Sequence, residues 1–149
     1  MKKIVIISFV LVTFNLFSQD IVGHWKTLDT NKNVNSIVEI YKDNSFYYGK
    51  IIRIPRKDYK GYCDTCKGQY KNKDLINAII LTDFEKTKDT YENGKITDPE
   101  NGKTYSCYLK LVSKNKLKIR GYIGFSMLGR TEYWYRVTKQ DFIKYQQKS

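Results

Sequence analysis

The sequence has little of what a helical protein needs. Alanine, the residue with the highest helix propensity, occurs only at Ala78, whereas tyrosine occurs thirteen times. Tyrosine favours strands, so the composition is poor for helices and good for sheets. With 149 residues the chain fits one domain, and it is too short for an enzyme with a separate cofactor domain.

Motifs of the common enzyme sites are also missing. The chain has a single histidine, His24, and it adjoins Trp25. No nucleophile elbow, phosphate-binding Walker loop, dinucleotide fingerprint or histidine-rich metal motif is present. The fifteen acidic residues form no pair that stands out. We therefore expect a protein that is not an enzyme, with no catalytic residue, no cofactor and no bound metal.

Long apolar runs are absent except at the start of the chain. Lys2 and Lys3 precede an apolar run over 4–17, which ends at Ser18. A positive start, a short apolar stretch and a small residue are typical of a secretory signal peptide. The run of about 14 residues is short for a membrane span, which needs about 20. We predict cleavage after 1–18 and a periplasmic or secreted protein; an N-terminal strand and an uncleaved anchor are the alternatives.

Acidic residues are outnumbered by basic ones, 15 against 27, which gives a formal charge of +12. Loss of Lys2 and Lys3 with the predicted signal peptide lowers this charge to +10. The lysines are spread along the chain, without a cluster or a nucleic-acid-binding signature. We expect no nucleic-acid partner, no transmembrane segment, and a weak attraction to anionic surfaces of the cell envelope.

Short runs rich in β-branched and aromatic residues, separated by turn residues, fill the rest of the chain. The Asn101-Gly102 pair after Pro99 predicts a hairpin, and Asn93-Gly94 could turn the chain within a weaker strand. The tail over 139–149 is expected to form a short helix or to fray. The strands are predicted over 22–28, 34–42, 45–54, 75–84, 91–97, 103–112, 116–123 and 130–138.

These strands predict an all-β fold, a single antiparallel barrel of about eight strands. Short connections favour antiparallel pairing, and closure into a barrel removes exposed sheet edges. Alternation supports sheet structure in places, because Cys107, Leu109 and Leu111 share one face of their strand. A two-sheet β-sandwich is the alternative. The predicted divisions are a signal peptide over 1–18, a barrel domain over 19–138 and a C-terminal tail over 139–149.

Gly23 and Trp25 open the first predicted strand with a Gly-x-Trp pattern that resembles the start of lipocalins and other calycins. In those barrels an arginine on the last strand lies across the tryptophan, and Arg136 matches this placement. A guanidinium group stacked on an indole is stabilising, more so away from water. The resemblance assigns Gly23, Trp25 and Arg136 to closure of the barrel rather than to a ligand.

Four further motifs follow the Gly-x-Trp start in a fixed order. They are Cys63-Asp-Thr-Cys66-Lys-Gly68, Asp98-Pro-Glu-Asn-Gly-Lys-Thr-Tyr105, Leu117-Lys-Ile-Arg-Gly-Tyr-Ile-Gly124 and Gly129-Arg-Thr-Glu-Tyr-Trp-Tyr-Arg-Val137. Together they make residues 21–138 similar to the exported bacterial family known as domain of unknown function 2147. The resemblance implies a small β-barrel in the cell envelope and brings no established activity or substrate. Asn77 and Tyr91 depart from the glycine and tryptophan common in the family, which leaves the fold assignment intact.

Cys63 and Cys66 lie in a polar loop predicted over 56–74. In an oxidising compartment such a pair is expected to form a disulfide that fixes the loop, with a metal site or free redox-active thiols as alternatives. Zinc would need about four ligands, and Cys107 and His24 are distant in sequence. Cys107 is expected to be a buried thiol that packs as a small apolar side chain.

The last two predicted strands carry arginines beside aromatic residues. Arg120 and Tyr122 share a face of one strand, and Arg130, Trp134 and Arg136 share a face of the next. Arginine binds carboxylates and phosphates through two hydrogen bonds, and an aromatic wall suits an apolar body. We predict a small-ligand-binding barrel for an anionic or amphipathic molecule, with Arg120, Tyr122, Arg130 and Trp134 as ligand-binding candidates. The alternative is an interaction or structural module of the envelope, with a filled core and no small ligand.

Overall fold

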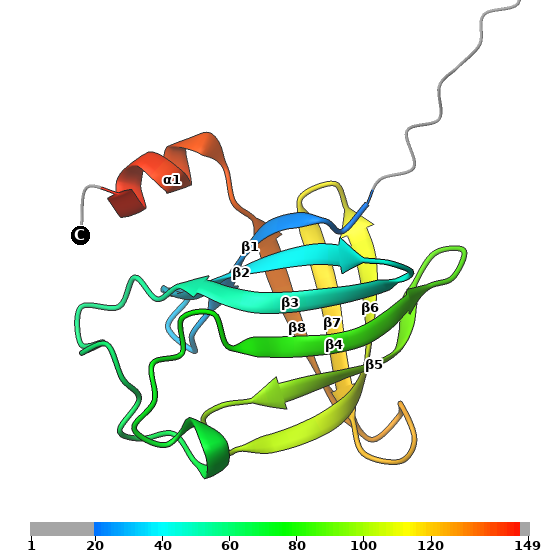
Figure 1. Cartoon of the computed structure of the whole chain (residues 1–149). Helices are drawn as coiled ribbons and strands as arrows, with labels where there is room; N and C mark the ends of the chain where they lie inside the picture. Colours follow the sequence, from blue (N-terminus) through cyan, green and yellow to red (C-terminus); the bar gives the residue numbers. More distant parts are fainter. Residues whose placement is uncertain (1–19, 147–149) are drawn as a thin grey trace, which may run out of the picture.

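In a computed structural model that describes residues 20–146, eight strands close into an antiparallel barrel (Figure 1). Each strand pairs with the next, and the last pairs with the first, which confirms the predicted barrel and excludes the sandwich. The strands are β1 (Gly23–Leu28), β2 (Val34–Asp43), β3 (Phe46–Arg53), β4 (Ile79–Lys86), β5 (Tyr91–Asp98), β6 (Lys103–Ser113), β7 (Lys116–Tyr122) and β8 (Gly129–Arg136). A short 3-10 helix, η1 (Gly68–Tyr70), precedes β4, and the helix α1 (Lys139–Gln146) follows β8. The predicted signal peptide lies outside the described residues, so its cleavage stays a prediction.

Seven of the predicted strands agree with the observed ones to within two residues at each end. The fourth was expected to begin at Leu75, but β4 begins at Ile79. Asn77 adopts a left-handed conformation with φ 68°, and the Ala78 amide donates to the Leu75 carbonyl. Because of this turn, β4 begins four residues later than predicted. Asn77 tolerates the turn because asparagine enters the left-handed region more readily than most residues.

The Asn93-Gly94 pair does not turn the chain, which corrects the alternative considered for this segment. Both residues lie inside β5, where the register against β6 shifts between Tyr91 and Gly94. Asn93 has φ 61°, so the strand forms a bulge there. A Cβ atom at Gly94 would overlap the Phe84 ring, so glycine is needed for this ring to fill the barrel.

The barrel interior is filled by large side chains. Trp25, Phe84, Leu109 and Leu117 are all less than 2% exposed. At Gly49 an added Cβ would lie 2.8 Å from the Leu81 side chain, so little free space remains beside it. Burial of this apolar surface is the main stabilising contribution to such a fold.

The hairpins fall at two ends of the barrel because neighbouring strands are antiparallel. The closed end holds the start of β1, the end of β8 and the β2–β3, β4–β5 and β6–β7 hairpins (Figure 1). The loop end holds the β1–β2, β3–β4, β5–β6 and β7–β8 connections.

The longest connection, between β3 and β4, folds back onto the loop end. The Sγ atoms of Cys63 and Cys66 lie 2.08 Å apart in a disulfide, and both residues belong to the buried core. The Lys67 amide donates to the Pro99 carbonyl at 3.2 Å, which joins the connection to the β5–β6 hairpin. The free thiol of Cys107 is fully buried.

Candidate ligand-binding site

The four ligand-binding candidates predicted on β7 and β8 do not come together. Opposite residues of an antiparallel pair point to the same face, and the ladder pairs Arg120 with Thr131 but Arg130 with Gly121. Arg120 and Tyr122 therefore lie on the outer face, whereas Arg130 and Trp134 lie on the face that lines the barrel. The four residues were expected to form one site. The pattern within a strand shows which residues share its face, but only the register between β7 and β8 shows which faces of the two strands coincide.

Arg120 holds the β7–β8 connection in place. Its Nε donates to the Ser126 carbonyl and its Nη2 to the Met127 carbonyl, each at 3.0 Å. Its Nη1 donates to Thr131 Oγ1 at 2.9 Å. All three hydrogen bonds come from a charged donor, which makes them stronger than neutral ones. Arg120 is therefore a structural residue of this loop.

Arg130 and Trp134 share a face but differ sharply in exposure. The Arg130 side chain is 80% exposed and forms an ion pair with Glu132 at 3.2 Å. Trp134 is 2% exposed, and its Nε1 has no hydrogen-bond partner in the described part of the chain. Arg130 thus lies at the rim of the loop end, and Trp134 belongs to the packed interior.

The residues predicted to close the barrel do meet. The Arg136 guanidinium lies 4.2 Å from the centre of the Trp25 ring. It also donates to the carbonyls of Asp20, Val22 and Lys114 at 2.9–3.0 Å. A Cβ at Gly23 would lie 3.0 Å from Arg136 Nη1, and Gly23 has φ 127°, so glycine is required there.

Asp20 completes the closed end and was not expected from the sequence. Tyr47 and Tyr91 each donate a hydroxyl hydrogen bond to its carboxylate at 3.2 Å. Burial raises the pKa of both tyrosines, and the negative charge of Asp20 raises it further. The hydroxyl of Tyr91 makes this contact possible.

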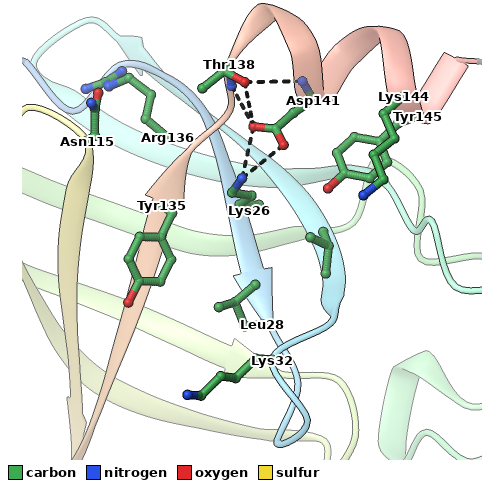
Figure 2. A pocket seen from close by; sticks show the side chains of 11 residues that line it. Lys26, Leu28, Lys32, Asn115, Tyr135, Arg136, Thr138, Asp141, Lys144 and Tyr145 are labelled. Carbon is green, nitrogen blue, oxygen red and sulfur yellow. Dashed lines mark hydrogen bonds and ion pairs between the residues drawn. The ribbon is translucent and has the colours of Figure 1, made fainter.

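A groove of about 500 Å³ lies outside the barrel, between α1 and the outer faces of β1 and β8 (Figure 2). Leu28, Val34 and Tyr135 give it an apolar and aromatic lining, and Tyr145 adds a second ring from α1. We call this feature the helix groove. Its other lining residues are Lys26, Lys32, Asn115, Arg136, Thr138, Asp141 and Lys144.

The helix over this groove is fixed by its own N-terminal cap. The Asp141 amide donates to Thr138 Oγ1 at 3.2 Å, and Asp141 Oδ2 accepts from the Thr138 amide and hydroxyl at 2.9 Å. Lys26 of β1 donates to both oxygens of the same carboxylate at 2.9–3.0 Å. Burial alone would raise the pKa of Asp141, but these hydrogen bonds and the Lys26 charge hold it below its ordinary value. The cap therefore also ties α1 to the barrel.

Two more contacts seat α1 on the outer face of the barrel. Phe142 meets the His24 ring edge-on at 5.1 Å, and the Arg53 guanidinium donates to the Tyr145 carbonyl. Ile37, opposite Lys26 on β2, is only 1% exposed although it lies on the outer face. The helix thus covers apolar surface that the barrel alone would leave in water.

The helix groove carries uncompensated positive charge. Lys26 is paired with Asp141, and the Arg136 guanidinium contacts the Trp25 ring and three carbonyls at the closed end. Lys32 and Lys144 have no acidic partner among residues 20–146. In Figure 2 they flank the groove from opposite sides, one from the β1–β2 connection and one from α1. An anionic group with an apolar body fits this arrangement chemically.

Sequence reasoning missed the helix groove because it forms only when α1 packs against β1. The spacing Thr138-x-x-Asp141 was the available signal, since it is typical of a helix start. Among residues 20–146, no group of three or more His, Cys, Asp or Glu side chains is placed so that it could hold a metal ion. None of the helices described is long and apolar enough to cross a membrane.

Comparisons with known proteins agree with this architecture. Protein HP1028 from the human pathogen Helicobacter pylori, described as belonging to the lipocalin family, superposes with a TM-score of 0.71. The match covers 85% of this chain and 89% of that one at 21% identity, so it shows a shared fold. No curated protein matches in sequence. A family profile described as "Uncharacterized protein conserved in bacteria (DUF2147)" matches residues 23–136, and the chain therefore belongs to this family.

Proposed function

We propose that this protein binds a small anionic or amphipathic molecule in the helix groove. The observation that carries the proposal is the pair Lys32 and Lys144, without acidic partners in the described structure, beside the apolar lining of Leu28 and Tyr135. A carboxylate or phosphate would lie near the ammonium groups, and an apolar body would cover the lining. A volume of about 500 Å³ suits a molecule of that kind.

We further propose that the protein acts outside the cytoplasm. The apolar run over 4–17 after two lysines supports export, and the Cys63–Cys66 disulfide is typical of an oxidising compartment. N-terminal sequencing of exported protein is expected to give a chain that begins near Gln19. An exported chain that still begins at Met1 would contradict the cleavage.

The same proposal assigns the protein a binding role without catalysis. Cys107 is the one free cysteine of residues 20–146, and burial raises the pKa of its thiol to about 12. At neutral pH it stays protonated, and the thiol is a far weaker nucleophile than the thiolate. This supports a packing role for Cys107.

Calorimetry with decanoate and fluorescence with anilinonaphthalene sulfonate, two anionic apolar probes, test the binding site. The Lys32→Gln/Lys144→Gln variant is expected to weaken binding by about tenfold, since two charge contacts are lost. Lys88→Gln/Lys110→Gln is the matched control, because it removes the same charge from exposed positions outside the groove. Equal weakening in both variants would overturn the groove as the site.

A second candidate function is a structural module with a filled core, and one observation favours it. The interior leaves no room for a Cβ beside Phe84 or Leu81, so that part of the barrel is packed with side chains. If the protein is such a module, the wild type will bind neither probe. That result would overturn ligand binding and favour the structural role.

A further inference from the structure

The connection between β7 and β8 exposes an unusual amount of apolar surface. Ile123, Phe125, Met127 and Leu128 are 71%, 79%, 88% and 72% exposed. Single exposed apolar residues are ordinary, but contiguous apolar patches mark interaction sites. We call residues 123–128 the apolar loop.

The apolar loop has a fixed backbone rather than a loose one. Arg120 donates to two of its carbonyls, those of Ser126 and Met127. The Leu128 amide closes a turn by donating to the Phe125 carbonyl at 3.0 Å. These hydrogen bonds fix the backbone of the loop in a conformation in which its four large apolar side chains are exposed to solvent.

We propose that the apolar loop inserts into the interfacial region of an anionic lipid bilayer. Arg130 lies two residues after the loop and is 80% exposed, so a cation whose ion-pair partner is the 45% exposed Glu132 accompanies the apolar side chains. The formal charge, +12 for the full chain and +10 without Lys2 and Lys3, attracts the protein to an anionic surface. Apolar side chains beside basic ones are the combination that binds the boundary between headgroups and acyl chains.

Charge and size favour a bilayer over a protein partner. A second copy of this chain carries the same net positive charge, which opposes association through a loop with an adjoining arginine. A stable protein interface buries about 800 Å² on each partner and involves about 20–30 residues. The apolar loop has six residues, so a bilayer suits it better than a stable protein complex.

Docking through this loop would place the loop end of the barrel against the bilayer. The β3–β4 connection lies at the same end, and there Tyr62 is 43% exposed. Tyrosine is favoured at the level of lipid headgroups. The closed end, with Asp20 and Arg136, would then point away from the membrane.

A tryptophan introduced into the loop gives a local test. The native Trp25 and Trp134 are 0% and 2% exposed, so they contribute a background that bound lipid cannot reach directly. In the Phe125→Trp variant we expect a blue shift of emission with phosphatidylglycerol-containing vesicles. The matched control is Val112→Trp, because Val112 is 54% exposed and lies near the β6–β7 hairpin at the opposite end. The control is expected to show no shift.

Vesicle sedimentation gives a second readout. The Phe125→Ser/Met127→Ser/Leu128→Ser variant is expected to bind anionic vesicles about fivefold less than the wild type, because most of the inserted apolar area is lost. Val112→Ser/Ile143→Ser, at two exposed positions outside the loop, is expected to bind like the wild type. All variants are used as the processed chain that begins near Gln19, so the apolar run over 4–17 is absent from each.

Four results would overturn the proposal. The first is the absence of a blue shift in the emission of the Phe125→Trp variant with anionic vesicles. The second is vesicle binding by the triple serine variant that equals the binding of the wild type. The third is a blue shift without vesicles together with a doubled mass in light scattering, which would assign the loop to a second copy of the chain. An equal shift with neutral phosphatidylcholine vesicles would overturn the requirement for anionic lipid.

Discussion

The two ends of the barrel use their side chains in opposite ways. At the closed end Arg136 stacks on Trp25 and donates to three carbonyls, while Asp20 accepts from two tyrosines. At the loop end the side chains of 123–128 face solvent, and Arg130 has only an exposed partner. The closed end therefore contributes to stability, whereas the β7–β8 connection of the loop end leaves its apolar side chains in solvent.

The largest effect is expected from breaking the closed end. Arg136→Met removes three charged hydrogen bonds and the contact with the buried Trp25 ring, which should lower the free energy of unfolding by about 3 kcal/mol. Urea unfolding followed by fluorescence measures this loss. Arg130→Met, at the loop end, should change stability by no more than about 0.5 kcal/mol. A similar loss in both variants would contradict the contrast between the ends.

One substitution made at two glycines sharpens the same contrast. Gly94→Ala places a methyl group against the Phe84 ring and should cost about 2 kcal/mol through overpacking. Gly121→Ala, nearer the loop end, meets the Ile96 side chain at 3.3 Å and Tyr105 Cβ at 3.8 Å, and should cost less. Thermal unfolding of the two variants compares them. A larger loss at Gly121 would show that packing is tighter toward the loop end.

Alkaline pH should weaken the contacts of Tyr47 and Tyr91 with Asp20 at the closed end. The folded pKa values of Tyr47 and Tyr91 are raised, so their contribution to stability is fully present below the unfolded value of about 10. Above that pH the unfolded chain loses these protons first, and stability falls as pH rises through the folded pKa values. Unfolding free energies between about pH 8 and 11 should show this decline. Tyr91→Phe should flatten it, and an unchanged slope would argue against the role of Tyr91.

A smaller effect on stability than that of the closed-end variants is expected from Arg120→Met. Two hydrogen bonds to the apolar loop and one to Thr131 are lost, but their acceptors become accessible to water, so the change should stay within about 1 kcal/mol. Hydrogen exchange should accelerate at the Leu128 amide, whose turn loses its support. Decanoate binding should not change, because Arg120 is not part of the helix groove. Loss of decanoate binding in this variant would show that Arg120 contributes to the ligand site.

The fold was predictable from the sequence where local signals agree with the tertiary structure. Strand alternation and turn residues located seven strands closely, and the Gly-x-Trp pattern identified the contact of Trp25 with Arg136. The start of β4 was misplaced because Leu75 and Ile76 continue an apolar run, although Asn77 turns the backbone. Apolar content alone does not show where a run leaves the sheet.

The location of the candidate site could not be predicted from the sequence, and the chemistry of its ligand stays a prediction. Basic and aromatic residues indicated an anionic or amphipathic ligand, but the register of β7 against β8 separates Arg120 from Arg130. The helix groove depends on contacts between Lys26 and Asp141, which are 115 residues apart in the sequence. Such long-range contacts leave no periodic pattern within either segment, so the site could not be located before the fold was known.

The most direct test of the proposed function is to map bound decanoate by NMR on isotopically labelled protein. Ligand binding in the helix groove predicts intermolecular contacts and shift changes at Leu28, Val34, Tyr135 and Lys144. The signals of Cys107 and Trp134 in the interior should stay unchanged. Shift changes confined to the interior, or no changes at any decanoate concentration, would contradict the groove as the binding site.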